Sequence, residues 1–82
     1  MGSVHGFPAV DPADAVVGAR LKHWRERRGL SLEDLARLMD MTPEEQRRIE
    51  AGRAHLNSLR IGTAISALRL PLWALTSDTR AY

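Results

Sequence analysis

The sequence has no cysteine among its 82 residues, and this absence excludes disulfide bonds, thiolate metal ligands and a thiol nucleophile. It also fits a reducing cytoplasm, which is the location we expect. Three histidines, His5, His23 and His55, are too scattered along the chain to indicate a metal site. No apolar run approaches the roughly 18 residues of a membrane-spanning helix, so we expect neither a metal nor a membrane as a partner.

Patterns typical of enzymes are also missing. The chain has no Ser/His/Asp set, no paired carboxylates and no phosphate-binding loop in a recognisable context. Short helices leave little room for a dry substrate pocket. We therefore expect no enzymatic activity and no cofactor.

The positive charge is unevenly distributed. Residues 1–14 contain Asp11 and Asp14 but no Lys or Arg, whereas residues 15–76 contain 11 Lys and Arg against 7 Asp and Glu. Nearly all the cations are arginines, whose planar guanidinium groups suit phosphates and guanine edges. The charge favours nucleic acid as a partner, but an Arg- and Ala-rich chain from a GC-rich genome explains the composition equally well.

The sequence predicts one all-α domain. Alternation of polar and apolar residues is absent and β-branched residues are few, so no strand is predicted. We expect an N-terminal arm over residues 1–10, a folded domain over 11–76 and a C-terminal tail over 77–82.

Capping residues and helix breakers divide the domain into five short helices. Each start has a capping residue, in three cases with a proline or an acid after it: Asp11-Pro12, Ser31 with Asp34, Thr42-Pro43, and Asn57 or Ser58. Gly29, Gly52 and Leu70-Pro71 mark the ends. The predicted helices span about 12–28, 32–39, 43–51, 58–69 and 72–76.

Apolar residues at helical spacing predict the face that each helix turns toward the core. The predicted core residues are Val17, Leu21 and Trp24 in the first helix, Leu32, Leu35, Ala36 and Met39 in the second, and Leu59, Ala64, Ile65 and Leu68 in the fourth.

The second and third predicted helices are short and are joined by a tight turn, which is the geometry of a helix-turn-helix. Five segments follow in order: Val17-Gly18-Ala19-Arg20-Leu21, Arg28-Gly29-Leu30-Ser31, Glu33-Asp34-Leu35-Ala36, Arg48-Ile49-Glu50-Ala51-Gly52-Arg53 and Ala67-Leu68-Arg69-Leu70-Pro71-Leu72. Together they resemble the Cro/CI-type (XRE, lambda repressor-like) helix-turn-helix family of phage and bacterial repressors. The resemblance covers roughly residues 17–75.

The resemblance implies a five-helix, dimeric domain that binds double-stranded DNA with its third helix in the major groove and regulates transcription. It implies an ion pair between Arg25 and Glu50 beside the DNA backbone, against the alternative of two separate surface charges. The residues it places at DNA are Ser31, Thr42, Pro43, Glu44, Arg47, Arg48, Arg53 and Asn57. Among these, Arg48 is the preferred reader of bases, and the amides from Thr42 onward are expected near a phosphate.

Three features depart from the family pattern. Leu32 replaces a glutamine that contacts phosphate in many relatives, and Gln46 stands where a buried aliphatic residue is usual. Glu44 and Glu45 put two acids at the groove end of the third helix, where they repel phosphates. Both acids could simply cap the helix, or Glu44 could accept a hydrogen bond from a cytosine amino group.

These departures leave a second function open, in which the scaffold binds mainly another protein, such as a second regulator, a toxin or RNA polymerase. Leu72 and Trp73 are the predicted interface, because an exposed Trp often marks one. In the resembling family the same segment often joins two copies of the chain, so a homodimer contact is the other interpretation. Packing of Trp73 under the tail or the arm is the third.

Overall fold

The computed structural model describes residues 11–75 and contains four α-helices and one short 3₁₀ helix. The elements are α1 (Pro12–Arg27), α2 (Leu32–Leu38), α3 (Pro43–Glu50), α4 (Ser58–Leu68) and η1 (Leu72–Ala74). The described residues include no strand, so the predicted all-α class is confirmed. The predicted arm, the predicted tail and Thr76 lie outside the described residues.

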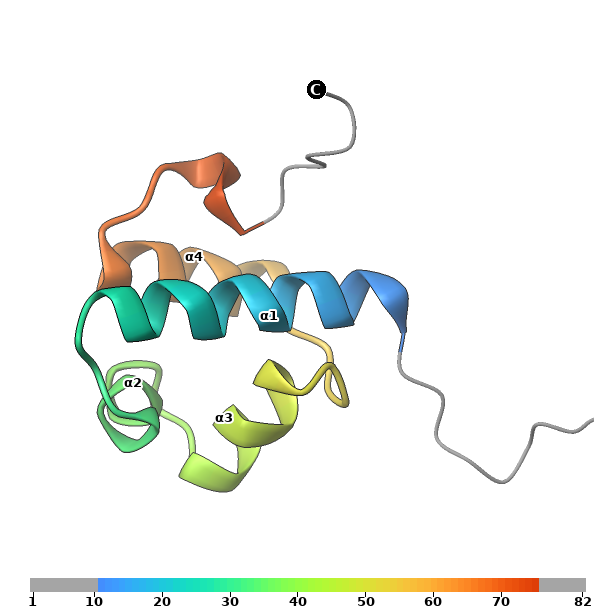
Figure 1. Cartoon of the computed structure of the whole chain (residues 1–82), viewed down its shortest axis with the longest axis horizontal. Coiled ribbons are helices and arrows are strands. Elements are labelled where there is room, and N and C mark those ends of the chain that lie inside the picture. Colours follow the sequence, from blue (N-terminus) through green and yellow to red (C-terminus); the bar gives the residue numbers. More distant parts are fainter. Residues whose placement is uncertain (1–10, 76–82) are drawn as a thin grey trace, which may run out of the picture.

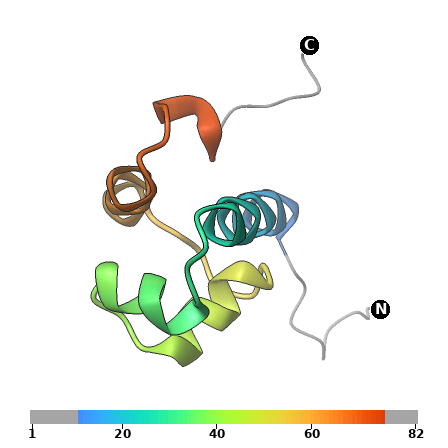
Figure 2. The ribbon, with the colours of Figure 1, turned by 60° about the vertical axis from the view of Figure 1, so that its left-hand side comes forward.

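The helices are arranged in three levels. Figures 1 and 2 show α1 beside α4, with α2 and α3 on one side of this pair and η1 on the opposite side. The first helix contacts both α3 and α4, and α2 contacts α3 and α4. The long first helix is therefore the support on which the shorter α3 is held.

The predicted capping residues begin the four helices. The Asp11 carboxylate accepts from the Ala13 amide at 2.8 Å, and Asn57, rather than Ser58, caps α4 by accepting from the Arg60 amide at 2.9 Å. Ser31 and Thr42 cap α2 and α3. Because a cap depends on residues two or three positions apart, the sequence alone was sufficient to locate these starts.

The helix ends lie close to the predicted positions. Gly29 and Gly52 have φ angles of +73° and +79° and follow the C-caps of α1 and α3. This left-handed backbone carries a steric cost for residues with a side chain, which is why glycine ends these helices.

The predicted fifth helix over 72–76 is a single 3₁₀ turn in the described part of the chain, so a count of five helices is not confirmed. The Ala74 amide donates to the Pro71 carbonyl at 3.0 Å, which closes one tight turn. The Leu75 carbonyl accepts a hydrogen bond from Arg20 Nη1 at 3.4 Å, which connects the end of this turn to α1. Ala74 and Leu75 are buried and hold this turn on the core.

The core gathers one face from each element. Its buried apolar residues are Leu21, Leu35, Met39, Ile49, Leu56, Ala64, Ile65, Leu68, Leu70, Ala74 and Leu75. Val17 and Trp24 pack against this cluster while partly exposed, and Leu32 is also only partly buried.

One predicted core residue is wrong. Leu59 is 78% exposed, because the inward face of α4 runs through Ile61, Ala64, Ile65 and Leu68. At 100° per residue, Leu59 points to the side of the helix opposite Leu68. The apolar character of Leu59 misled the prediction, since it falls outside the spacing of its neighbours.

Gly18 allows α1 and α3 to approach with their backbones in contact. A Cβ atom at this position would collide with the Ile49 carbonyl oxygen and press on the Glu50 carbonyl. These atoms belong to the last turn of α3 and have little freedom to move. The glycine therefore sets the distance between the supporting helix and α3.

We predict that Gly18→Ala destabilises the domain by about 1–3 kcal/mol, the usual cost of overpacking, although alanine favours a helix. Gly62→Ala on α4 is the matched control, because a Cβ atom there meets no atom within 4 Å. The control should be stabilising by up to about 1 kcal/mol. Urea unfolding of both variants measures the difference, and equal stabilities would refute the close approach.

Candidate nucleic-acid interface

A four-residue turn joins α2 to α3. Met39 ends α2, Asp40 takes a positive φ of 56°, and the Met41 amide returns to the Ala36 carbonyl at 2.9 Å. Met39 is buried in the core, so the turn is anchored from inside. This turn fixes the angle at which α3 leaves α2, as a helix-turn-helix requires.

The third helix has one buried face and one exposed face. Gln46 and Ile49 are turned inward, at 0% and 3% exposure. The exposed residues of the helix are Pro43, Glu44, Glu45, Arg47 and Arg48. No segment within residues 11–75 covers this outer face.

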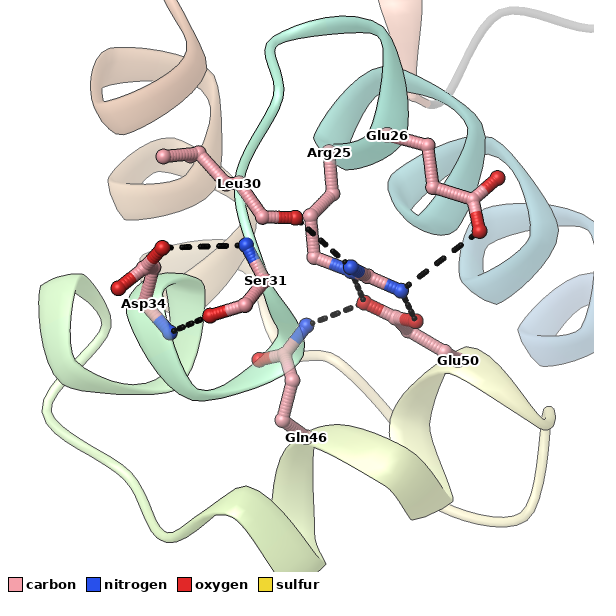
Figure 3. Close-up of polar contacts among 7 residues, drawn as sticks. All are labelled: Arg25, Glu26, Leu30, Ser31, Asp34, Gln46 and Glu50. Carbon is pink, nitrogen blue, oxygen red and sulfur yellow. Dashed lines mark hydrogen bonds and ion pairs between the residues drawn. The ribbon is translucent and has the colours of Figure 1, made fainter.

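A buried ion pair fixes the C-terminal end of α3. Arg25 Nε donates to Glu50 Oε2 at 2.8 Å and Nη2 donates to Oε1 at 3.0 Å, in a two-pronged contact (Figure 3). The two side chains are only 10% and 5% exposed. The hydrogen bond to Glu50 raises the pKa of Arg25 further above its ordinary value, against the opposing effect of burial. The structure thus brings together the two residues that the family resemblance paired.

The same arginine also reaches the loop before α2. Its Nη1 donates to the Leu30 carbonyl at 2.9 Å, one residue before the Ser31 cap (Figure 3). Arg25 thereby ties both helices of the helix-turn-helix to α1. Because desolvation offsets much of the attraction in a buried pair, its main effect is to fix orientation.

Gln46, which the sequence marks only as a departure from the family pattern, belongs to the buried ion-pair network. Its Nε2 donates to Glu50 Oε2 at 2.9 Å, so the amide completes the environment of the buried carboxylate. Its Oε1 is buried without a hydrogen-bond partner in the described residues. The signal was present in the sequence, since positions 46 and 50 lie one helical turn apart.

Both helices of the helix-turn-helix begin with a complete capping box. Ser31 Oγ accepts from the Asp34 amide at 3.0 Å, and Asp34 Oδ2 accepts from the Ser31 amide at 3.1 Å. The Ser31 amide, and after it the Ser31 hydroxyl, lower the pKa of the Asp34 carboxyl below its ordinary value. The amide of Ser31, a residue expected near DNA, is thus occupied by the protein's own carboxylate.

The start of α3 is similarly occupied. Thr42 Oγ1 accepts from the Glu45 amide at 3.1 Å, and Glu45 Oε1 accepts from the Thr42 amide at 3.1 Å. Pro43 has no amide hydrogen, so among residues 42–45 only the Glu44 amide lacks a hydrogen bond to another part of the described chain. The expected phosphate site at this helix start is therefore reduced to one donor in this conformation.

The exposed arginines differ in their partners. Arg47 Nη1 lies 2.9 Å from Glu44 Oε1, one turn earlier on α3. Arg48 and Arg53 are exposed and form no ion pair with any residue in 11–75. Arg48 is thus the cation of α3 that is available without breaking a contact.

The loop after α3 is tied to α1 and to α4. His55 Nδ1 lies 2.8 Å from Asp14 Oδ1 of α1, and Asn57 caps α4. Arg53 is exposed on this loop, and the Asn57 side-chain oxygen accepts a hydrogen bond from the Arg60 amide.

A shallow hollow lies beside the Arg25–Glu50 ion pair. It adds one cation, Lys22, to the site residues predicted from the sequence. It is lined by Lys22, Arg25, Leu32, Arg47, Glu50 and Ala51.

The predicted interface residue Trp73 is 63% exposed. It belongs to η1, which lies on the side of the α1–α4 pair opposite α2 and α3 (Figure 2). A contact through η1 therefore leaves the outer face of α3 free. Leu72 belongs to the same turn. Its side chain is not among the described parts of the structure, so its predicted role at an interface stays a prediction.

Two other kinds of site were sought in residues 11–75. No group of three His, Asp or Glu side chains in this range is placed to hold a metal ion. None of the described helices has the length and hydrophobicity needed to cross a bilayer.

Comparison with known proteins identifies the fold. Residues 16–71, well over half of the chain, match a family model described as a helix-turn-helix domain. Two crystal structures of the clp gene regulator ClgR from Corynebacterium glutamicum have the same fold, each with a TM-score of 0.75. One is 23% identical and covers 79% of this chain and 84% of its own; the other is 22% identical and covers 82% and 71%. No curated protein sequence matched.

We predict that Arg25→Ala destabilises the domain by about 3–5 kcal/mol, because it leaves the buried Glu50 carboxylate without its counter-charge. Arg48→Ala removes an exposed arginine with no ion pair and should change stability by less than about 0.5 kcal/mol. Urea unfolding followed by circular dichroism compares the two. If Arg25→Ala is unfolded in buffer, the prediction holds in its extreme form; stability equal to that of Arg48→Ala contradicts it.

Proposed function

Because the chain belongs to the helix-turn-helix domain family, we propose that it is a sequence-specific regulator of transcription that binds double-stranded DNA with α3 in the major groove. The observation that carries this proposal is the uncovered outer face of α3, held in one orientation by the buried Arg25–Glu50 pair. A major groove accepts one α-helix, whose N-terminal residues then meet the base edges. No enzymatic activity is proposed.

The exposed residues at the start and along the outer face of α3 have different proposed roles in DNA recognition. Arg48 is the principal candidate for reading a base, since its guanidinium forms no ion pair in the described residues. Arg47 is the second candidate, because its guanidinium already forms an ion pair with Glu44. Thr42 and Pro43 are exposed at the start of the helix, where close approach to DNA is expected.

Phosphate contacts come mainly from side chains in this proposal. The capping boxes occupy the Ser31 and Thr42 amides, which weakens the usual attraction of a helix start for an anion. Arg53 on the loop after α3 and Lys22 on α1 are exposed and supply positive charge in their place. Ser31 and Asn57 remain proposed contacts at the edges of this surface.

We further propose a homodimer that binds an inverted repeat with half-sites about 10 to 10.5 base pairs apart. Leu72 and Trp73 are the proposed contact, since an exposed Trp is typical of interfaces. ClgR is described as a gene regulator, which supports a regulatory role by analogy. The proposed location is the cytoplasm, at the nucleoid, and the proposed action is to block or recruit polymerase at a promoter as a repressor or co-regulator.

A second candidate function is that of a protein-binding module. Exposed Trp73, together with two acids at the start of α3, favours it. The partner would be a second regulator, a toxin or RNA polymerase, held on η1 or on α3.

We predict that the protein binds mixed-sequence duplex DNA and that affinity falls steeply as salt rises, because neutralised phosphates release counterions. Arg53→Ala should weaken binding to all sequences and reduce the salt slope by about one. Arg48→Ala should instead lose about 1–3 kcal/mol of discrimination between the best site and random duplex. Fluorescence anisotropy at two salt concentrations measures both. Absence of binding at low salt would exclude the DNA-binding proposal and leave the protein-binding module.

We predict that Trp73→Gln shifts the protein from dimer to monomer, since it removes the largest exposed apolar side chain of η1. Leu38→Gln is the matched control, because Leu38 is 53% exposed on α2, on the other side of the molecule. Sedimentation equilibrium gives the mass of each. A dimer that persists in Trp73→Gln, or a wild-type monomer, removes Trp73 from the self-contact.

A further inference from the structure

The two acids at the start of α3 are engaged in different ways. Glu45 closes the capping box by accepting from the Thr42 amide at 3.1 Å. Glu44 accepts no backbone hydrogen bond in the described structure, and its carboxylate instead faces Arg47 at 2.9 Å. Glu44 is 73% exposed and Arg47 is 59% exposed, so the pair lies on the outer face of α3. Helix capping therefore explains Glu45, whereas Glu44 takes no part in the capping box.

The pair presents donors and an acceptor in a fixed order. The Arg47 guanidinium offers N–H donors, and the adjacent Glu44 carboxylate offers an acceptor. In the major groove, a G·C base pair presents two guanine acceptors, N7 and O6, followed by the cytosine N4 amino donor. The pair on α3 is the complement of this edge, with the guanidinium matching guanine and the carboxylate matching cytosine.

From this complementarity we propose that Glu44 and Arg47 act as one unit that reads a single G·C base pair. The inference rests on the proposed function. An A·T pair presents an acceptor, a donor and an acceptor, so its adenine amino group would face guanidinium donors and its thymine oxygen would face the carboxylate. Such like-to-like contacts leave polar groups unpaired, which is what rejects the wrong base.

The ion pair also makes a carboxylate tolerable in the groove. A lone Glu44 would meet the field of the phosphates, whereas the paired carboxylate shares the charge of Arg47 and the unit is neutral overall. Arg47 in turn is held one helical turn from Glu44, so less side-chain freedom is lost when the unit meets DNA. The unit therefore adds specificity to that of Arg48, while Arg53 and Lys22 supply net positive charge.

The test is selection of binding sites from a random duplex library by the full chain, for wild type and for Glu44→Ala, Arg47→Ala and Glu45→Gln. We expect wild type to select a G·C pair at one position of each half-site, and Glu44→Ala and Arg47→Ala to lose about tenfold in preference at that same position. Glu45→Gln, which keeps an oxygen to cap the helix, should leave that preference intact. Loss of preference at two different positions, or none in Glu44→Ala, would overturn the inference.

A modified duplex tests the cytosine contact at the level of one atom group. Replacing the cytosine of that pair by pyrimidin-2-one removes the 4-amino group. Wild type should lose about tenfold in affinity, and Glu44→Ala should bind the modified and natural duplexes equally. Equal binding by wild type refutes the cytosine contact while DNA binding itself stands. If wild type binds no duplex at low salt, the proposed function fails, and this inference fails with it.

Discussion

The interaction on which the described structure depends is the buried ion pair between Arg25 and Glu50, called the fork below because two guanidinium nitrogens contact the two carboxylate oxygens. A helix of eight residues has little stability alone, and α3 has only Gln46 and Ile49 buried within its bounds. The fork fixes the far end of this helix against α1, while Gly18 lets the two backbones meet. The position of the exposed face of α3 therefore follows from a contact that the face itself does not make.

Burying this ion pair carries a desolvation cost, and neighbouring polar groups offset it by hydrogen bonding to the carboxylate. A buried carboxylate needs all of its lone pairs satisfied. Glu50 accepts from two nitrogens of Arg25 and from Gln46 Nε2. An aliphatic residue at position 46 would leave one of these bonds unmade. The polar residue is thus consistent with a charged neighbour, even though its own Oε1 has no partner among the described residues.

Much of the local structure was predictable because its causes lie close together in the sequence. The caps at Ser31 and Thr42 involve residues three positions apart, and each was located in advance. The prediction that Leu59 belongs to the core was wrong, because Leu59 is apolar but lies on the side of α4 opposite Leu68. The fifth helix over 72–76 is not confirmed, since the described residues form only the 3₁₀ turn Leu72–Ala74 there, and the Leu75 carbonyl accepts from Arg20, which is distant in sequence. The pairing of Arg25 with Glu50 came from family resemblance alone, since residues 25 positions apart leave no local signal.

If this surface binds DNA as proposed, the distribution of charge bears on the selection of sequences as well as on the attraction of DNA. Acids close both capping boxes, so the helix starts offer few free amides to phosphates. Attraction then depends on side chains such as Lys22 and Arg53, which act at any sequence. A surface with weakened backbone contacts gains a larger share of its binding free energy from base edges. The acids that lower overall affinity would thereby raise the ratio of specific to non-specific binding, which is the quantity that matters among many competing sites.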